Sequence, residues 1–117
     1  MPDMNINLKR VYEQPGEHDG ERILVERLWP RGLKKADAAI DVWLKDVAPS
    51  AELRTWFGHQ PERWAEFRKR YRAELGNNPE AVAKLRELCV DGPVTFVYAA
   101  RDTERNGAVV LREFLLS

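Results

Sequence analysis

One continuous apolar run, residues 94–100 (VTFVYAA), constrains the fold of this chain more than any other part of its sequence. Its length and its mixture of β-branched and aromatic residues are typical of a β-strand. The run has no regular apolar–polar alternation, and strands of that kind lie in the centre of a sheet whose two faces are both covered. We therefore predict a buried central strand, followed directly by the charged pair Arg101-Asp102.

Two more strands are predicted near the start of the chain. Residues 6–12 carry β-branched and aromatic side chains with partial alternation. Residues 22–28 form a more continuous apolar run, which the sequence Trp29-Pro30-Arg31-Gly32 ends. The linker between the two strands is shorter than the dozen or so residues that a parallel crossover usually needs. A hairpin and a parallel arrangement therefore both stay open.

Helix signals follow in the middle of the chain. Ser50 precedes residues 51–57 and Gly58 follows them, which predicts a short helix with a cap at each end. Pro61 opens a longer helix that runs to Leu75. The 3.6-residue period predicts that its buried face carries Trp64, Phe67, Tyr71 and Leu75.

Two further helices complete the chain. Asn78-Pro79 begins a helix that ends near Val90, and Asn106 caps a terminal helix. Residues 34–49 give a weaker signal, which indicates a short helix or turn leading into an extended segment. The order of strands, helices, strand and helix predicts a single compact α/β domain over residues 1–117, with helices packed on a small, mostly parallel sheet.

Charge and composition exclude several classes of protein. The 19 basic and 19 acidic residues give a net charge of zero, so the molecule as a whole does not attract polyanions and any basic site must be local. Cys89 is alone, which excludes an internal disulfide and favours a reducing cytoplasm; we interpret it as a small core residue. The sequence contains neither a secretory signal nor a run of ~18 apolar residues. We therefore expect a cytoplasmic protein with no membrane partner.

Familiar cofactor and nucleophile motifs are absent from the sequence. It contains no Walker loop, no G-x-G-x-x-G fingerprint and no G-x-S-x-G elbow. Two histidines, His18 and His59, and one cysteine give no spacing that would hold zinc. We therefore expect no cofactor and no metal site; a metal held by carboxylates alone stays open, but no motif in the sequence indicates one.

Charged residues gather where two of the predicted strands end. Glu26, Arg27, Trp29 and Arg31 surround the end of the strand at 22–28, and Arg101-Asp102 follows the strand at 94–100, shortly before the helix start at Asn106. In open α/β sheets, ligands bind outside the carboxyl ends of the strands, near helix N-termini that present free N–H groups. Guanidinium groups pair bidentately with phosphate or carboxylate. We therefore predict that a pocket for a small anionic ligand, phosphate-like or nucleotide-like, is lined by Arg27, Trp29, Arg31, Arg101 and Asn106, provided that the strands are parallel neighbours.

Each of these residues also has a structural interpretation. Arg27 could pair with Asp102 or Glu26 and tie two strand ends together. Trp29 could stack on a ligand ring or plug the end of the sheet, and we favour the plug. A catalytic role stays open: Asp102 would then be the acid/base candidate, and His59 a second one that is also explained as a surface or capping histidine.

Two alternative functions use other features. A nucleic-acid-associated module would use Trp29 and a basic helix face that could meet phosphates. That face carries Arg63, Arg68, Lys69, Arg70 and Arg72. Interleaved glutamates favour a solvated face instead, and the zero net charge favours the small ligand. A non-catalytic interaction domain would lack a cleft between residues 27–31 and 101–106. The sequence does not define the oligomeric state.

Three blocks of the sequence carry a resemblance to a known family. They are residues 23–32 (ILVERLWPRG), residues 94–111, and a set of positions between them. That set comprises Trp43, Ala48-Pro49-Ser50, Leu53-Arg54, Trp56-Phe57, His59, Pro61, Trp64, Phe67, Arg70-Tyr71 and Glu74-Leu75. Together they resemble the YeaO-like branch of the domain-of-unknown-function family 488 along nearly the whole chain. The resemblance implies a small cytoplasmic α/β protein of bacterial or archaeal type, with no established activity.

The chain departs from the family pattern at four positions. The family usually has Asp, Lys, His and Asn where this chain has Glu26, Arg101, Arg105 and Gly107. Charge is kept at positions 26 and 101, so the predicted anion site is compatible with the family. The missing histidine at position 105 argues against an essential catalytic histidine there, and Gly107 weakens any role for an amide.

Overall fold

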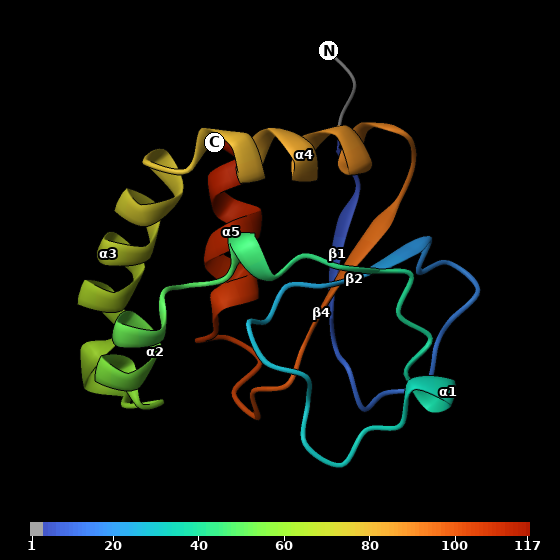
Figure 1. Cartoon of the computed structure of the whole chain (residues 1–117), viewed down its shortest axis with the longest axis horizontal. Helices are drawn as coiled ribbons and strands as arrows, with labels where there is room; N and C mark the ends of the chain where they lie inside the picture. Colours follow the sequence, from blue (N-terminus) through green and yellow to red (C-terminus); the bar gives the residue numbers. More distant parts are fainter. Residues whose placement is uncertain (1–3) are drawn as a thin grey trace.

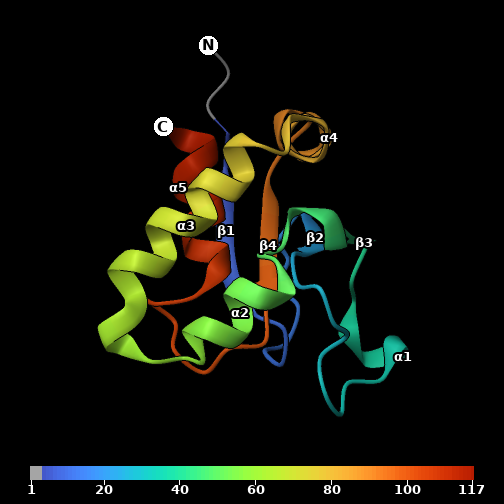
Figure 2. The ribbon, with the colours of Figure 1, turned by 60° about the vertical axis from the view of Figure 1, so that its left-hand side comes forward.

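Four parallel strands form one sheet in the order β1-β4-β2-β3 (Figures 1 and 2). The computed structural model describes residues 4–117. The strands are β1 (Ile6–Arg10), β2 (Glu21–Leu24), β3 (Val42–Trp43) and β4 (Val94–Tyr98). The α/β class and the parallel sheet predicted from the sequence are confirmed.

Strand β4 occupies the centre of the sheet, as its apolar run predicted. All five of its residues are buried, and they alternate between two covered faces. Val94 and Phe96 join the large core cluster beneath the helices. Val97 joins a smaller cluster on the opposite face. A strand buried on both faces needs apolar residues at successive positions, which explains the continuous run.

Strand β1 pairs with β4 and not with β2, so the hairpin alternative is wrong. Strand β4 lies between them and is parallel to both. The linker from β1 to β2 spans the width of β4, and it passes close to the residues that lead into β4. Gly20, at φ 64°, makes that approach possible, since a Cβ there would lie 1.9 Å from the carbonyl oxygen of Pro93. Thr95 Oγ1 also donates a hydrogen bond to the Asp19 carbonyl at 2.7 Å.

Strand β2 ends at Leu24, four residues earlier than the sequence predicted. Two hydrogen bonds to Glu26 end the pairing of β2 with its neighbours, and the continuous apolar run gave no sign of them. The carbonyl of Glu26 accepts a hydrogen bond from the Trp43 indole N–H at 2.7 Å, and the Glu26 carboxylate accepts one from the Ala99 N–H at 3.1 Å. The chain after Leu24 is therefore a loop, as are Ala99 and Ala100 after β4.

The helices begin and end close to their predicted positions. They are α1 (Lys35–Ala38), α2 (Ala51–Phe57), α3 (Trp64–Gly76), α4 (Pro79–Val90) and α5 (Gly107–Leu116), with 3-10 turns at Lys45–Val47 and Pro61–Arg63. Both predicted N-caps are present: Ser50 accepts from the Leu53 N–H, and Asn106 accepts from the Val109 N–H, each at 3.1 Å. The α-helix expected from Pro61 starts as the 3-10 turn and becomes α-helical at Trp64. None of the helices in residues 4–117 is long and apolar enough to cross a membrane.

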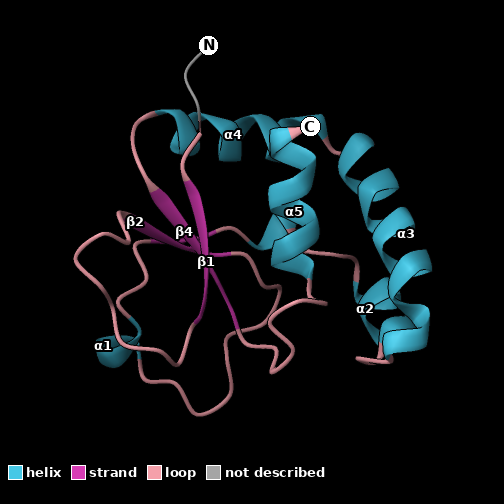
Figure 3. Cartoon of the chain, turned by 180° about the vertical axis from the view of Figure 1, so that it is seen from behind, coloured by secondary structure: helices cyan, strands magenta, loops and turns pink. Residues whose placement is uncertain are grey.

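The two faces of the sheet are covered by different kinds of structure. Helices α3 and α5 lie on one side of the sheet, while α1 lies on the other (Figure 2). Part of that second face is covered by the segment 29–43, whose tryptophans Trp29 and Trp43 pack around Leu24 and Val97. Helix α4 lies near the amino ends of the strands, and loops gather beyond their carboxyl ends (Figures 1 and 3). The carboxyl end is where the predicted site residues lie.

Candidate ligand-binding cleft at the carboxyl end of the sheet

A cleft of about 940 Å³ lies at the carboxyl end of the sheet. Three parts of the chain form its walls: the loop after β2, the β4–α5 connection with the first turn of α5, and α2 with the residues that flank it. These segments meet because β2 and β4 are parallel neighbours whose carboxyl ends point the same way. The cleft therefore lies between residues 27–31 and 101–106, where the sequence predicted a pocket.

Six of the seven predicted site residues line this cleft. They are Trp29, Arg31, His59, Arg101, Asp102 and Asn106. Arg27 does not line it. Its Nε donates to the Pro49 carbonyl at 3.2 Å and its Nη2 to the Ala48 carbonyl at 3.3 Å. Arg27 therefore fastens the loop after β2 to the segment that precedes α2.

Arg54 supplies the third guanidinium group that the sequence interpretation had assigned to Arg27. It lies on α2 and lines the cleft, together with Phe57 one turn later. Its signals in the sequence were its position next to Leu53, on the edge of the buried helix face, and its place among the residues that carry the family resemblance. The sequence does not show that this edge of α2 faces the β2 and β4 ends.

Three arginine side chains in the cleft have no recorded partner within residues 4–117. No hydrogen bond or ion pair in this part of the protein involves the guanidinium groups of Arg31, Arg54 or Arg101. Two carboxylates, Glu26 and Asp102, share the cleft with them. Because Asp102 is already paired with Arg105 at 3.4 Å, positive charge predominates around the cleft.

Glu26 belongs to the charged cluster that marks this cleft in the sequence, although the predicted ligand-binding residues did not include it. It is partly buried, and one carboxylate oxygen, Oε1, accepts the Ala99 N–H at 3.1 Å. Burial raises the pKa of this carboxyl, although the Ala99 N–H and the charges of Arg54 and His59 favour its ionised form. The sequence placed Glu26 within the predicted strand at 22–28, and it gave no sign of the Ala99 donor that orients the carboxylate.

Asp102 organises the loop between β4 and α5. Its Oδ1 accepts the N–H groups of Glu104 at 2.9 Å and Arg105 at 3.0 Å. These two hydrogen bonds, with Arg105 also contributing its charge, lower the pKa of the Asp102 carboxyl below its usual value. The Asp102 carbonyl also accepts from Asn106 Nδ2 at 2.9 Å. The loop thereby fixes the first turn of α5 at the edge of the cleft.

Trp29 and His59 hold different positions in the cleft wall. The Trp29 indole donates to the Leu33 carbonyl at 2.7 Å, and its ring lies edge-on to Trp43, with 5.4 Å between ring centroids. Trp29 thus packs against the end of the sheet as well as lining the cleft. His59 is exposed, with its backbone in the left-handed region at φ 58° and its ring centroid 6.0 Å from that of Phe57.

The basic face of α3 has extensive contacts within the protein. The Arg63 and Arg70 guanidinium groups lie over the Trp56 ring, at 5.4 Å and 4.3 Å from its centroid. Arg70 also pairs with Glu66, four residues earlier on the same helix, at 2.9 Å. These contacts give the arginines a structural use that does not involve nucleic acid.

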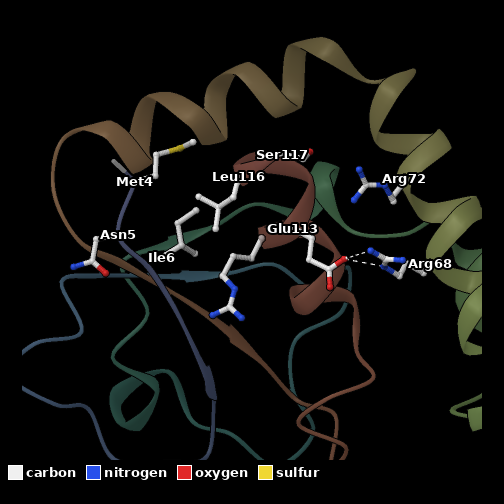
Figure 4. Close-up of a pocket in the computed structure, with 9 residues that line it drawn as sticks. Met4, Asn5, Ile6, Arg68, Arg72, Glu113, Leu116 and Ser117 are labelled. Carbon is white, nitrogen blue, oxygen red and sulfur yellow. Dashed lines mark hydrogen bonds and ion pairs between the residues drawn. The ribbon is translucent and has the colours of Figure 1, made fainter. Parts of the chain in front are cut away.

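A second, shallower hollow of about 590 Å³ lies by the start of β1, between α3 and the end of α5 (Figure 4). Arg68 and Arg72 line it, but Arg68 pairs with Glu113 at 2.7 Å across it. Within residues 4–117, no group of three His, Cys, Asp or Glu side chains is arranged to hold a metal ion.

Comparisons with known proteins show where the chain belongs. Residues 5–117 match the family model DUF488-N3i, described as the inactive DUF488-N3 subclade. The chain is 46% identical over 113 residues to an uncharacterised protein of Mycobacterium tuberculosis (strain H37Rv), covering 97% of this chain and 95% of the relative. It is 45% identical over 114 residues to the uncharacterised protein YeaO of Escherichia coli (strain K12), covering 97% and 99%. No solved structure gives a significant match. The chain therefore belongs to the DUF488 family, to the YeaO-like branch that its sequence resembled.

Proposed function

We propose that this protein binds a small anionic ligand, phosphate-like or nucleotide-like, in the cleft at the carboxyl end of its sheet. The observation that carries the proposal is the set of three arginines, Arg31, Arg54 and Arg101, that line the cleft without a recorded partner in residues 4–117. An unpaired guanidinium group presents several N–H donors in a plane that fits the oxygens of a phosphate or carboxylate.

The first turn of α5 adds to this attraction for an anion. Asn106, Gly107 and Ala108 line the cleft at the start of a ten-residue helix. The first N–H groups of a helix lack partners within the helix, and its dipole is positive at that end. The Asn106 side chain satisfies the Val109 N–H, which leaves the earlier N–H groups to solvent or to a ligand.

Size and wall composition favour an organic anion. A volume of about 940 Å³ lies within the range of pockets that hold small organic molecules, and is far larger than a phosphate ion needs. Apolar side chains, among them Val25, Leu28 and Phe57, form much of the wall. Such a wall provides contact for the organic part of a ligand while the arginines contact its charge.

Binding without catalysis fits the cleft better than an enzymatic role. Hydrogen bonds lower the pKa of Asp102, so it lacks the proton of a general acid, and both of its carboxylate oxygens already accept hydrogen bonds from Glu104 and Arg105 of its own loop, which leaves it poorly placed as a general base. His59 has no recorded hydrogen-bond partner within residues 4–117 to orient its ring. The description of the matching subclade as inactive supports the same choice.

Isothermal titration calorimetry with inorganic phosphate and adenosine 5′-monophosphate tests the proposal. We expect Arg101→Gln and Arg54→Gln each to weaken binding by about tenfold or more, the effect of losing one charge-assisted hydrogen bond. Lys84→Gln is the matched control, because Lys84 is exposed on α4 near the opposite end of the sheet. The proposal is wrong if neither probe binds at millimolar concentration, or if the control variant weakens binding as much as Arg101→Gln does.

Fluorescence anisotropy with a single-stranded oligonucleotide separates this function from nucleic-acid association. Binding along a phosphate backbone weakens steeply as salt rises. Oligonucleotide binding with that salt dependence, lost when the charges on α3 are removed and retained in Arg101→Gln, would favour the nucleic-acid module instead.

A further inference from the structure

The cleft contains a carboxylate that anion binding alone does not explain. Glu26 faces the same space as Arg31, Arg54 and Arg101, and a negative charge there weakens the attraction for a bare anion. Its burial also has a desolvation cost. A site for inorganic phosphate alone gains nothing from this residue.

The bonding of Glu26 leaves one of its oxygens open. Oε1 accepts the Ala99 N–H at 3.1 Å, and no donor to Oε2 is recorded within residues 4–117. No fully buried side-chain oxygen in that part of the protein lacks a hydrogen-bond partner. Oε2 is therefore not fully buried, Glu26 lines the cleft, and the Ala99 N–H fixes one side of the carboxylate.

An ionised carboxylate only accepts hydrogen bonds, so Oε2 requires a donor from the ligand. Burial raises the pKa of the Glu26 carboxyl, and two neighbouring side chains oppose that rise. Arg54 from α2 and His59 from the turn after it both favour the ionised form of Glu26. The cleft thus has two chemically different parts: arginines and a helix start that take a negative group, and a fixed carboxylate that takes a donor.

On the assumption that the proposed anion site is right, we infer that its ligand is a hydroxylated phosphate monoester, a sugar phosphate or nucleotide whose sugar hydroxyl donates to Glu26. The phosphate contacts the arginines, and a sugar hydroxyl reaches Oε2. The size of the cleft and its apolar wall accommodate the sugar and an attached base. Glu26 then selects such ligands against inorganic phosphate, because a hydroxyl compensates for the buried charge and a second anion does not.

Glu26→Gln gives a test in which two ligands respond with opposite sign. The glutamine carbonyl can still accept the Ala99 N–H, but its NH₂ group presents donors to the cleft in place of an acceptor. We expect the variant to bind inorganic phosphate several-fold more tightly, because a like charge is removed. We expect it to bind ribose 5-phosphate and adenosine 5′-monophosphate about tenfold more weakly, because a hydrogen bond to a charged acceptor is lost.

A ligand-side comparison keeps the test independent of how the variant folds. Wild-type protein is titrated with adenosine 5′-monophosphate and with its 2′,3′-dideoxy form, which lacks both sugar hydroxyls. Weaker binding of the dideoxy form by about tenfold supports the inference. Equal binding overturns it, as does a Glu26→Gln variant that changes all three affinities in the same direction.

Arg101→Gln separates failure of this inference from failure of the proposed function. One outcome is that Arg101→Gln weakens phosphate binding while removal of the sugar hydroxyls and the Glu26→Gln change leave nucleotide affinity unaltered. In that case the anion site is supported and the assignment of Glu26 is wrong. If wild-type protein binds none of the probes, both fall. Far-UV circular dichroism and the urea midpoint establish that each variant is folded before it is titrated.

Discussion

Replacing Arg27 by methionine distinguishes its structural role from the ligand-binding role that its sequence position suggested. The guanidinium donates to the Pro49 and Ala48 carbonyls at 3.2 Å and 3.3 Å. Both of these residues are buried, so their carbonyls lose access to a donor when the guanidinium is removed. Methionine keeps most of the apolar stem, so the change chiefly removes the two hydrogen bonds.

The expected loss of stability follows from those two bonds. A hydrogen bond to a charged group contributes about 1.5–3 kcal/mol, and bonds longer than 3 Å lie at or below the lower end of that range. Part of this loss of folding free energy is offset, because folding of the variant no longer removes a charged group from water. We therefore expect the free energy of unfolding of Arg27→Met to fall by about 2 kcal/mol.

Urea unfolding followed by tryptophan fluorescence measures this change. With an m-value of about 1.5 kcal/mol/M, typical of a small domain, the midpoint should fall by roughly 1 M. Arg101→Met is the matched comparison, since Arg101 is exposed and has no recorded partner within residues 4–117. Its midpoint should change by less than the equivalent of about 0.5 kcal/mol.

Phosphate titrations of the same two variants complete the experiment. We expect Arg27→Met, measured where it is fully folded, to retain wild-type affinity, and Arg101→Met to lose about tenfold. An unchanged urea midpoint for Arg27→Met, combined with a loss of phosphate affinity as large as that of Arg101→Met, would refute this assignment of roles.

Two further predictions concern the stability of the fold. Burial opposes ionisation of Asp19, but hydrogen bonds from Gly16, Lys9 and Arg22 outweigh it and lower the pKa from 3.8 to about 2. These contacts therefore stabilise the fold above pH 3.8 by at most about 2 kcal/mol, and this contribution is lost as the pH falls through 2. Asp19→Asn removes it, so the free energy of unfolding of the variant should change less than that of the wild type between about pH 4 and 2. Parallel pH profiles of the two proteins would contradict this. His59 holds a left-handed backbone at φ 58°, so His59→Gly should raise the free energy of unfolding by about 0.5–1 kcal/mol relative to His59→Ala, measured by urea unfolding.

Local signals in the sequence predicted the elements whose formation depends on adjacent residues. The caps at Ser50 and Asn106 act within three residues of themselves, and both are present as expected. The run that forms β4 is continuous because both faces of the strand are covered, and all five of its residues are buried. Helix caps and buried strands of this kind depend on a short stretch of residues, so a single sequence is enough to predict them.

The end of β2 and the order of the strands depend on groups distant in the sequence. The Glu26 backbone leaves the sheet pairing because Trp43 and Ala99, 17 and 73 residues away, bond to it or to its side chain. Strand β4 lies between β1 and β2, and the linker that joins those two strands passes against Pro93 at Gly20, where a side chain would not fit. Neither contact has a local signature, so the sequence left the strand arrangement open and placed the end of β2 too late.

The different uses of Arg27 and Arg54 have one physical cause. Residues 48 and 49 connect a 3-10 turn to α2 and belong to no strand, so their carbonyls have no sheet partner and need a donor from elsewhere. Arg27 lies within reach and satisfies them, whereas Arg54 lies on α2 beside the cleft, and its guanidinium group has no recorded hydrogen bond within residues 4–117. An arginine near a strand end therefore remains available to a ligand only where it is not the donor to an otherwise unpaired backbone carbonyl. That condition depends on the folded backbone, which explains why the sequence placed Arg27 in the predicted pocket and did not include Arg54.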